Sequence, residues 1–239
     1  MRTTSLLVDD DILIDAGTGL GDLTLEEMAR IRHIFITHSH LDHIAGLPLM
    51  TDSIFGGIEQ PIALHAAAET LDALREHIFN WTVWPDFTQL PTPKDGVLRY
   101  EVMRHGEVRE IAGRRIRMIP VNHVVPGVAY GIESGGRVAV FSGDTTTNDT
   151  LWAALNDYSG VDTLIVECAF PNQEIELCRR AYHYCPELLA ADLRKLRHRP
   201  RLYLTHLKPG AETRIEGECR ALIEGFDLRR LFGGDLIQL

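Results

Sequence analysis

The segment Thr37-His38-Ser39-His40-Leu41-Asp42-His43 places four metal-capable side chains within six positions. It follows a short apolar run, residues 31–37, that predicts a strand. It precedes Ile44-Ala45-Gly46-Leu47-Pro48, which predicts a short helix that ends at Pro48. We therefore expect the segment in a strand-to-helix turn at the carboxyl end of a strand, where open α/β sheets place their ligand sites.

The spacing within this segment suits two neighbouring metal ions. His38 and His40 lie two residues apart in extended chain, so their side chains point to the same side. Asp42 and His43 are adjacent and point apart. One turn can then supply His38 and His40 to a first metal, and Asp42 and His43 to a second. Imidazole with some carboxylate suits zinc, manganese or iron. The alternative, a chance cluster of surface histidines beside a helix, does not usually have this geometry.

The string His-Ser-His-Leu-Asp-His resembles the metal signature of the metallo-β-lactamase fold superfamily. The longer string HSHLDHIAGLPLMTDS, residues 38–53, resembles the signature region of class II cyclic-nucleotide phosphodiesterases. The resemblance implies an α/β fold, a four-layer αβ/βα sandwich of two mixed sheets flanked by helices, as a single domain over residues 1–239. The chain starts after the point where the superfamily's first strand should end, so we expect that strand to be absent.

Three later motifs complete the ligand set that the resemblance implies. His123 follows a predicted strand, residues 116–120, and becomes the third histidine of the first metal. Asp144, in the string SGDT after a predicted hairpin with a Gly-Gly turn, becomes the carboxylate that bridges both metals. His206, in the string THLKPG, joins Asp42 and His43 on the second metal. The expected metal ligands are His38, His40, Asp42, His43, His123, Asp144 and His206.

Two further residues are candidates near this centre. The resemblance places Asp15 under the metal site, where it is either a hydrogen-bond partner of a ligand histidine or a residue that caps a turn. His183 matches loosely a histidine that holds the scissile phosphate in related enzymes, so it is a phosphate contact, a proton donor or a simple helix-start residue. Asp42 could also orient the attacking hydroxide. The predicted catalytic residues are therefore Asp42 and His183.

Composition and charge limit the partners. The hydrophobic content of 45% and charged content of 24% are ordinary for a soluble globular protein. No apolar run approaches the roughly 20 residues of a membrane helix, and the first residues lack a secretory signal. Four cysteines without CxxC spacing predict reduced, mostly buried thiols in a cytoplasmic protein. The net charge of −10 disfavours nucleic acid as a partner but allows a small anionic substrate, because a metal pair supplies local positive charge.

The aromatic stretch Phe79 to Phe87 has two interpretations. It is either a lid or dimer-contact loop whose rings could stack on a nucleobase, or a small core under a long loop. Several local elements are also predicted. They are a helix over 23–30 capped by Asp22, antiparallel strands over 97–120 with Arg114 to Arg117 on a solvent face, a buried strand over 162–168, a helix over 188–197, and a helix with a short strand over 226–237.

The resemblance implies a dinuclear metal-dependent hydrolase, with zinc as the first choice of metal and manganese or iron as alternatives. We expect a phosphodiesterase that cleaves 3′,5′-cyclic nucleotides to 5′-monophosphates by a metal-bridging hydroxide. The alternatives are a tRNase Z-like endoribonuclease and a hydrolase of the thioesterase or lactonase type, because one fold supports several reactions. A metal protein without catalysis is disfavoured because no ligand is missing. A homodimer is an expectation from the resemblance alone.

Overall fold

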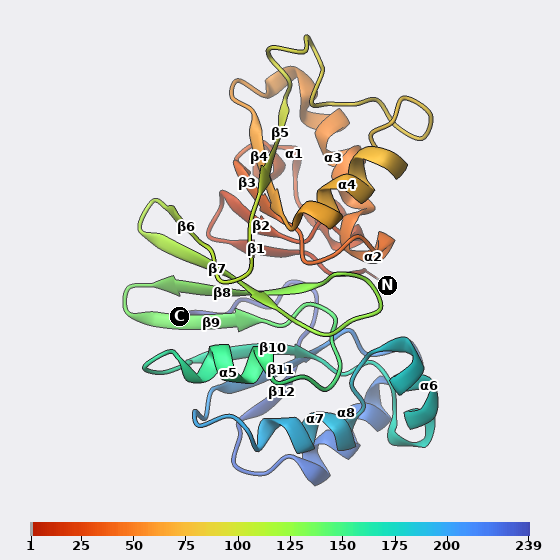
Figure 1. The fold of residues 1–239 in the computed structure, drawn as a ribbon, viewed down its shortest axis with the longest axis vertical. Helices are drawn as coiled ribbons and strands as arrows, with labels where there is room; N and C mark the ends of the chain where they lie inside the picture. Colours follow the sequence, from red (N-terminus) through yellow and green to blue (C-terminus); the bar gives the residue numbers. More distant parts are fainter. Residues whose placement is uncertain (1) are drawn as a thin grey trace. The chain divides into compact units, whose positions relative to one another are not determined.

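The computed structural model describes residues 2–239, and the chain forms two compact units. The first ends at Arg104, and the second covers His105–Leu239. Each unit contains one mixed sheet flanked by helices, which Figure 1 shows in sequence colours. The two mixed sheets confirm the predicted α/β class.

The sheet of the first unit has the strand order β1-β2-β3-β4-β5. A turn at Asp9, with φ of 52°, joins the antiparallel pair β1 and β2. The other neighbours pair in parallel, including β4 with β5, so the prediction of antiparallel pairing is wrong for β5. The strands are β1 Leu6–Val8, β2 Ile12–Ile14, β3 His33–Phe35, β4 Ile62–Ala66 and β5 Leu98–Val102.

The helices of the first unit pack on one face of this sheet (Figure 1). Leu47 and Met50 from one helix and Leu71 and Leu74 from another are buried against the strand residue Ile34 and its neighbours. The helical elements are η1 Thr18–Asp22, α1 Leu25–Met28, α2 Leu41–Ile44, α3 Gly46–Ile54, η2 Phe55–Gly57 and α4 Ala68–His77.

Two predicted helix ends in this unit are wrong. The N-cap of α1 is Thr24 and not Asp22, because Thr24 Oγ1 accepts from the Glu27 N–H while Glu27 Oε2 accepts from the Thr24 N–H. Pro48 does not end a helix. It lies in the first turn of α3, where a missing N–H costs no intrahelical hydrogen bond.

The aromatic stretch divides between core and surface. Phe79 and Phe87 are buried with ring centroids 6.2 Å apart, and Trp84 packs against the same core. Trp81 is 59% exposed. The interpretation as a small core therefore holds for the two phenylalanines, whereas Trp81 faces solvent.

The sheet of the second unit has the order β12-β11-β10-β9-β8-β7-β6. Strands β6 to β9 pair antiparallel, and β9 to β12 pair in parallel. Gly135 and Gly136, with φ of 56° and 79°, form the predicted turn between β8 and β9. The strands are β6 Val108–Ile111, β7 Arg114–Pro120, β8 Val128–Ser134, β9 Arg137–Phe141, β10 Thr163–Glu167, β11 Arg201–Thr205 and β12 Leu228–Arg230.

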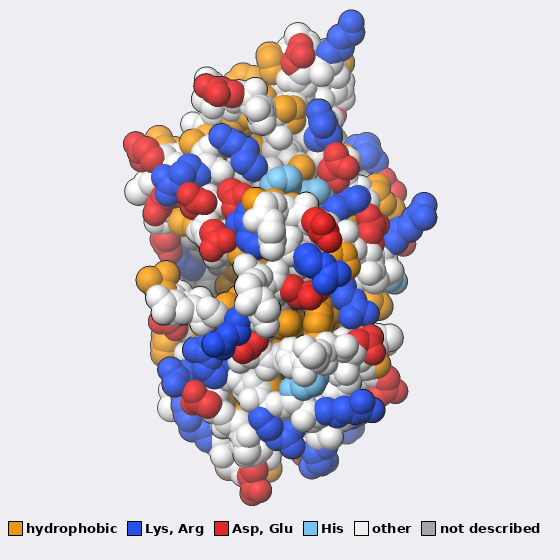
Figure 2. All heavy atoms as spheres, turned by 90° about the vertical axis from the view of Figure 1, so that its left-hand side faces the viewer, with side chains coloured by type: hydrophobic (Ala, Val, Ile, Leu, Met, Phe, Trp, Pro, Cys, Tyr) orange, Lys and Arg blue, Asp and Glu red, His pale blue; other side chains and the backbone are white. Residues whose placement is uncertain are grey.

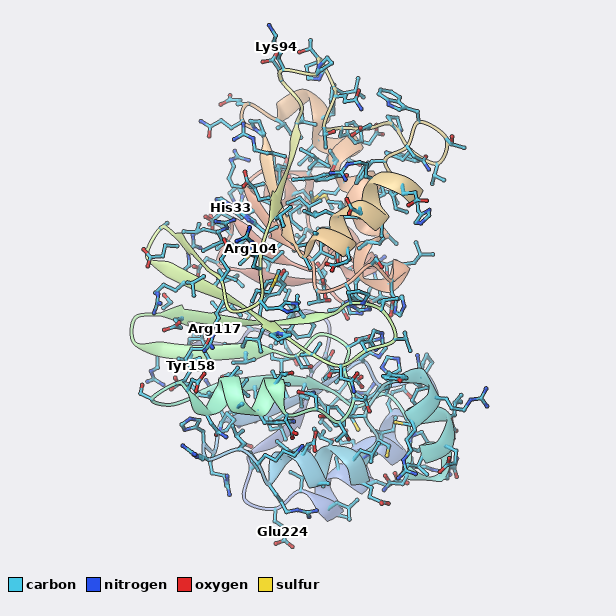
Figure 3. The ribbon with its side chains drawn as sticks, in the orientation of Figure 1. His33, Lys94, Arg104, Arg117, Tyr158 and Glu224 are labelled. Atoms are coloured by element: carbon cyan, nitrogen blue, oxygen red, sulfur yellow. The ribbon has the colours of Figure 1, made fainter. Side chains whose placement is uncertain are left out.

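The basic stretch of β7 is only partly a solvent face. Arg114 is buried, and its Nε donates to the Ile111 carbonyl oxygen. The guanidinium carbon of Arg117 lies 5.6 Å from the centre of the Tyr158 ring, and both residues are labelled in Figure 3. Arg115 is exposed, as predicted.

Three helices of the second unit cover one face of its sheet. Trp152 from α5, Leu189 from α7 and Ile215 from α8 are buried against β10 and β11. The predicted helix within 226–237 is wrong, because that segment contains only β12, and α8 was not predicted. The helical elements are α5 Thr150–Asn156, η3 Asn172–Glu174, α6 Ile175–Ala181, α7 Pro186–Leu193 and α8 Glu212–Leu222.

The state of the cysteines, the helix lengths and the surface charges can be compared with what the composition predicts. All four cysteines are reduced and buried, as predicted. Within residues 2–239, no helix is both long enough and apolar enough to cross a bilayer. On the face shown in Figure 2, acidic and basic side chains are interspersed.

Candidate metal centre

The first group of candidate ligands lies in the turn between β3 and α2, as the sequence predicts. The strand ends at Phe35 and the helix begins at Leu41. The ring centroid of His38 lies 4.6 Å from that of His40 and 4.2 Å from that of His43. His43 Nε2 lies 3.8 Å from Asp42 Oδ2. The turn therefore gathers three imidazoles and a carboxylate.

Asp15 organises this turn from beneath. Its Oδ2 lies 2.6 Å from His43 Nδ1, and its Oδ1 accepts from the Thr37 N–H at 2.8 Å. The Thr37 hydroxyl donates to Asp15 Oδ2 at 2.8 Å and lies 3.0 Å from His38 Nδ1. Asp15 thus contacts His43 directly and His38 through Thr37, so the structure favours a hydrogen-bond partner of a ligand over a residue that only caps a turn.

These contacts orient the two rings for metal binding. A histidine that donates from Nδ1 presents Nε2 as its ligand atom, and such an outer contact fixes both tautomer and ring direction. His38 and His43 are fully buried and have this arrangement. The imidazole and carboxylate donors of this turn fit a divalent cation such as zinc.

The second group of candidate ligands lies at the carboxyl ends of strands in the second unit. His123 follows β7, Asp144 follows β9 and His206 follows β11. Strands β9 and β11 are both parallel to β10 between them, so Asp144 and His206 come to one edge of the sheet. His206 Nε2 lies 3.2 Å from Asp144 Oδ2. His123 Nδ1 lies 3.0 Å from the Tyr182 carbonyl oxygen, which leaves Nε2 as its candidate ligand atom.

His183 lies beside this second group. Its ring centroid is 5.0 Å from that of His123 and 5.1 Å from that of His206. The helix α7 begins only at Pro186, so His183 does not cap it. Tyr182, with φ of 55°, ends α6 and turns the chain just before His183. The structure therefore places His183 with the candidate ligands of its unit.

Glu167 is a residue of this group that the sequence analysis missed. It ends β10, is fully buried, and its Oε1 lies 2.7 Å from His183 Nδ1. Its carboxylate also accepts from the N–H groups of Thr145 at 3.0 Å, Ala169 at 3.1 Å and Tyr184 at 3.3 Å. Burial, followed by the nearby Asp144 carboxylate, raises the pKa of Glu167 well above its usual range. The signal was available in the sequence, because Glu167 is an acidic residue that directly follows the apolar run 164–166.

Taken unit by unit, the structure gathers every predicted site residue into a compact group. The first unit brings together His38, His40, Asp42 and His43. The second brings together His123, Asp144, His183 and His206. Ligand atoms of Glu167, His183 and His206 all lie within 4.8 Å of one another.

Residues 10–207 match the Beta-lactamase superfamily domain. The chain belongs to this family. The match covers both groups of candidate ligands, and with the two mixed sheets it confirms the expected metallo-β-lactamase fold. Members of the β-lactamase superfamily with this fold are hydrolases that use divalent metal ions, which the donor sets of both units suit.

The curated relatives of this chain include proteins named cyclic-nucleotide phosphodiesterase and proteins named ribonuclease Z. The chain is 27% identical over 232 residues to the "Probable 3′,5′-cyclic-nucleotide phosphodiesterase" of Yersinia pestis, covering 87% of this chain and 63% of the relative. It is 26% identical over 238 residues to the ribonuclease Z of Anoxybacillus flavithermus, covering 82% and 74%. The chain thus spans less than two thirds of the length of the phosphodiesterase relative.

Solved structures of the superfamily share the fold at low identity. Unliganded yeast PDE1 aligns with a TM-score of 0.78 and 20% identity, over 94% of this chain and 90% of that one. The YhfI protein of Bacillus subtilis aligns with a TM-score of 0.74 and 17% identity, over 96% and 88%. Identity this low supports the fold and not the reaction.

Proposed function

We propose that this protein is a dinuclear metal-dependent phosphodiesterase that cleaves 3′,5′-cyclic nucleotides to 5′-monophosphates. The observation that carries the proposal is the pair of histidine and carboxylate groups, one in each unit, in which His38, His43 and His123 are held through Nδ1. Rings held this way are typical of metal ligands. Because the chain belongs to a superfamily of metal-dependent hydrolases, a catalytic role is the simplest explanation for these two groups.

The proposed ligand assignment uses all seven residues. His38, His40 and His123 hold the first metal, Asp42, His43 and His206 hold the second, and Asp144 bridges them. The short distance between His206 Nε2 and Asp144 Oδ2 supports a shared ion for that pair. When bound, two divalent cations supply an activated water and positive charge against the phosphoryl oxygens. Zinc is the proposed ion, with manganese and iron as alternatives.

Glu167 and His183 are proposed to handle the leaving group. The Glu167 carboxylate holds His183 through Nδ1, so Nε2 is the atom that can give a proton. For a cyclic nucleotide, Nε2 would protonate the departing 3′ oxygen of the ribose. Asp42 is 38% exposed at its side chain, which suits a carboxylate that accepts a hydrogen bond from the attacking water.

The substrate class rests on the relatives and on charge. The phosphodiesterase name belongs to a relative that aligns with 87% of this chain. The net charge of −10 favours a small phosphodiester over a large nucleic acid, whose binding depends on many basic contacts. A tRNase Z-like endoribonuclease is the second candidate, because this chain covers 74% of a ribonuclease Z.

The direct test is hydrolysis of 3′,5′-cyclic AMP by protein reconstituted with zinc or manganese, with the product identified by chromatography. The expected result is release of 5′-AMP that is abolished in His40→Ala. The matched control is His77→Ala, which removes an imidazole whose side chain is 68% exposed. Cleavage of precursor tRNA without turnover of the cyclic nucleotide would replace the proposal with the second candidate. Turnover of thioesters or lactones alone would exclude both phosphodiesterase assignments.

A further inference from the structure

The buried carboxylate of Asp192, in α7, receives hydrogen bonds from three other segments. It is 2% exposed, and its Oδ2 accepts from the Tyr184 hydroxyl at 2.7 Å, the Trp152 Nε1–H at 3.1 Å and the Asn148 N–H at 3.1 Å. Lys195 Nζ lies 2.8 Å from the other oxygen, Oδ1. A buried carboxylate is expensive unless it is fully hydrogen-bonded, and here two of the bonds go to segments that adjoin proposed functional residues.

One of these segments is the turn that follows Asp144. Asn148 Nδ2 donates to Thr145 Oγ1 at 3.1 Å and to the Thr146 carbonyl oxygen at 2.8 Å. The Thr145 hydroxyl in turn donates to the carbonyl oxygen of Asn122 at 3.2 Å, next to His123. The Asn148 backbone N–H donates to Asp192, so Asp192 fixes the turn that follows Asp144.

A second of these segments carries His183. Tyr184 follows His183 directly, is fully buried, and donates its backbone N–H to Glu167 Oε2 at 3.3 Å. Its carbonyl oxygen accepts from the Ala169 N–H at 2.9 Å. Burial, followed by the Asp192 charge, raises the pKa of the Tyr184 hydroxyl well above its usual range. The hydroxyl therefore stays a neutral donor to Asp192.

We propose that Asp192 is a positioning residue that fixes His183 and the turn of Asp144 relative to Glu167. This proposal rests on the proposed function, because that function gives His183 and Asp144 their roles. Asp192 acts through Tyr184 on one side and through Asn148 on the other. The bond between the Tyr184 hydroxyl and Asp192 thereby sets the direction of the His183 ring and its contact with Glu167.

Two variants separate positioning from simple stability. Tyr184→Phe and Trp152→Phe each remove one neutral buried donor from the same Asp192 oxygen, and both keep an aromatic ring in place. Trp152 Nε1 also lies 3.4 Å from the Tyr184 oxygen, but Trp152 is in α5 and adjoins no proposed catalytic residue. We expect Tyr184→Phe to lower the Tm by about 2–4 °C, and Trp152→Phe to lower it by at least as much, because the smaller ring also leaves a cavity in the core.

The deciding readout is the proton NMR signal of His183 Nδ1–H, recorded with the zinc-loaded and the metal-free protein. The short bond to Glu167 should place this signal far downfield in the wild type. Tyr184→Phe should shift it and speed its exchange with water, whereas Trp152→Phe should not. Asp192→Ala should act like Tyr184→Phe, and Asp192→Asn, whose amide oxygen can take the place of Oδ2, should restore the signal.

Activity gives a second readout. We expect Tyr184→Phe to lower kcat about tenfold with little change in KM, and Trp152→Phe to change kcat less than about twofold. Equal effects of the two variants on the His183 signal would overturn the proposal. If the wild-type protein hydrolysed no phosphodiester, the proposed function would fail, but the NMR comparison would still decide whether Asp192 positions His183.

Discussion

Asp15 Oδ2 lies 2.6 Å from His43 Nδ1, and neither side chain is exposed to solvent. Asp15 adopts a positive φ of 57° just after β2, which aims its carboxylate beneath the turn of the ligand histidines. The contact fixes the tautomer of His43 and leaves Nε2 as its candidate ligand atom. Asp15, 28 positions before His43, thus orients a candidate ligand of the proposed metal centre.

Asp15→Asn should weaken metal binding about 10- to 100-fold, because the neutral amide is a poorer acceptor for His43 Nδ1–H. Asparagine tolerates a positive φ, so the backbone is preserved. Isothermal titration with zinc in a competing chelator measures the affinity. Asp9→Asn is the control, because Asp9 also has a positive φ, of 52°, but lies in the exposed turn between β1 and β2. Equal affinity of the Asp15 variant and wild type would contradict this role.

Glu167→Gln should lower kcat about 10- to 100-fold. Every contact of the Glu167 carboxylate is with a donor, so an amide N–H in place of either oxygen would face a donor and release His183 or Tyr184. The free energy of unfolding should also fall by about 1–3 kcal/mol. Steady-state kinetics and urea unfolding measure the two effects. Glu224→Gln, at an exposed residue labelled in Figure 3, should change neither.

The hydrogen bonds of the Asp162 carboxylate predict that the stability of the fold depends on pH. Its Oδ2 accepts from the Val138 N–H, and its Oδ1 accepts from Arg137 Nη1. The Val138 hydrogen bond, aided by Arg137, lowers the pKa of Asp162. A lowered pKa in the folded state stabilises the protein above the unfolded pKa of about 3.9, and this contribution is lost as the pH falls through the folded value.

The measurement is urea unfolding of wild type and Asp162→Asn between pH 6 and pH 2. The difference in free energy of unfolding should be constant above about pH 5 and shrink as the pH falls below about 4. A difference that stays the same down to pH 2 would show that the charge of Asp162 does not stabilise the fold.

Two substitutions in the aromatic stretch should differ strongly in their effect on the free energy of unfolding. Phe87→Ala removes a ring that is 2% exposed, so the free energy of unfolding should fall by about 3–5 kcal/mol. Trp81→Ala removes a ring that is 59% exposed, so the change should be below about 0.5 kcal/mol. Urea denaturation compares them. A large loss in Trp81→Ala would indicate that its ring packs against the protein in solution.

The sequence predicted the elements whose signal is local. Apolar runs and glycine turns located the hairpin of β8 and β9 and the buried strand β10. The cluster of residues 38–43 located the first ligand group, because all four side chains come from one turn. His123, Asp144 and His206 needed the resemblance, since a single histidine or aspartate after a strand is unremarkable alone.

The features that were missed depend on contacts distant in sequence. The parallel pairing of β5 with β4 depends on the crossover connection through α4, which the alternation of residues 97–102 does not reveal. Glu167 gains its role from a hydrogen bond to His183, 16 residues later, and Asp192 from bonds to residues as far as 44 positions away. The N-cap of α1 is the exception among the missed features, because its signal is local: the capping box of Thr24 with Glu27 satisfies two N–H groups, and Asp22 does not cap the helix.

The proposed function requires this chain to hold two divalent cations with seven side chains. The most direct measurement is the zinc content of reconstituted, desalted protein by plasma mass spectrometry, for the wild type and Asp144→Ala. We expect two zinc ions per chain in the wild type and at most one in the variant, because Asp144 is the proposed bridge. A wild-type protein that retains no zinc, or the same two ions with and without Asp144, would contradict the claim.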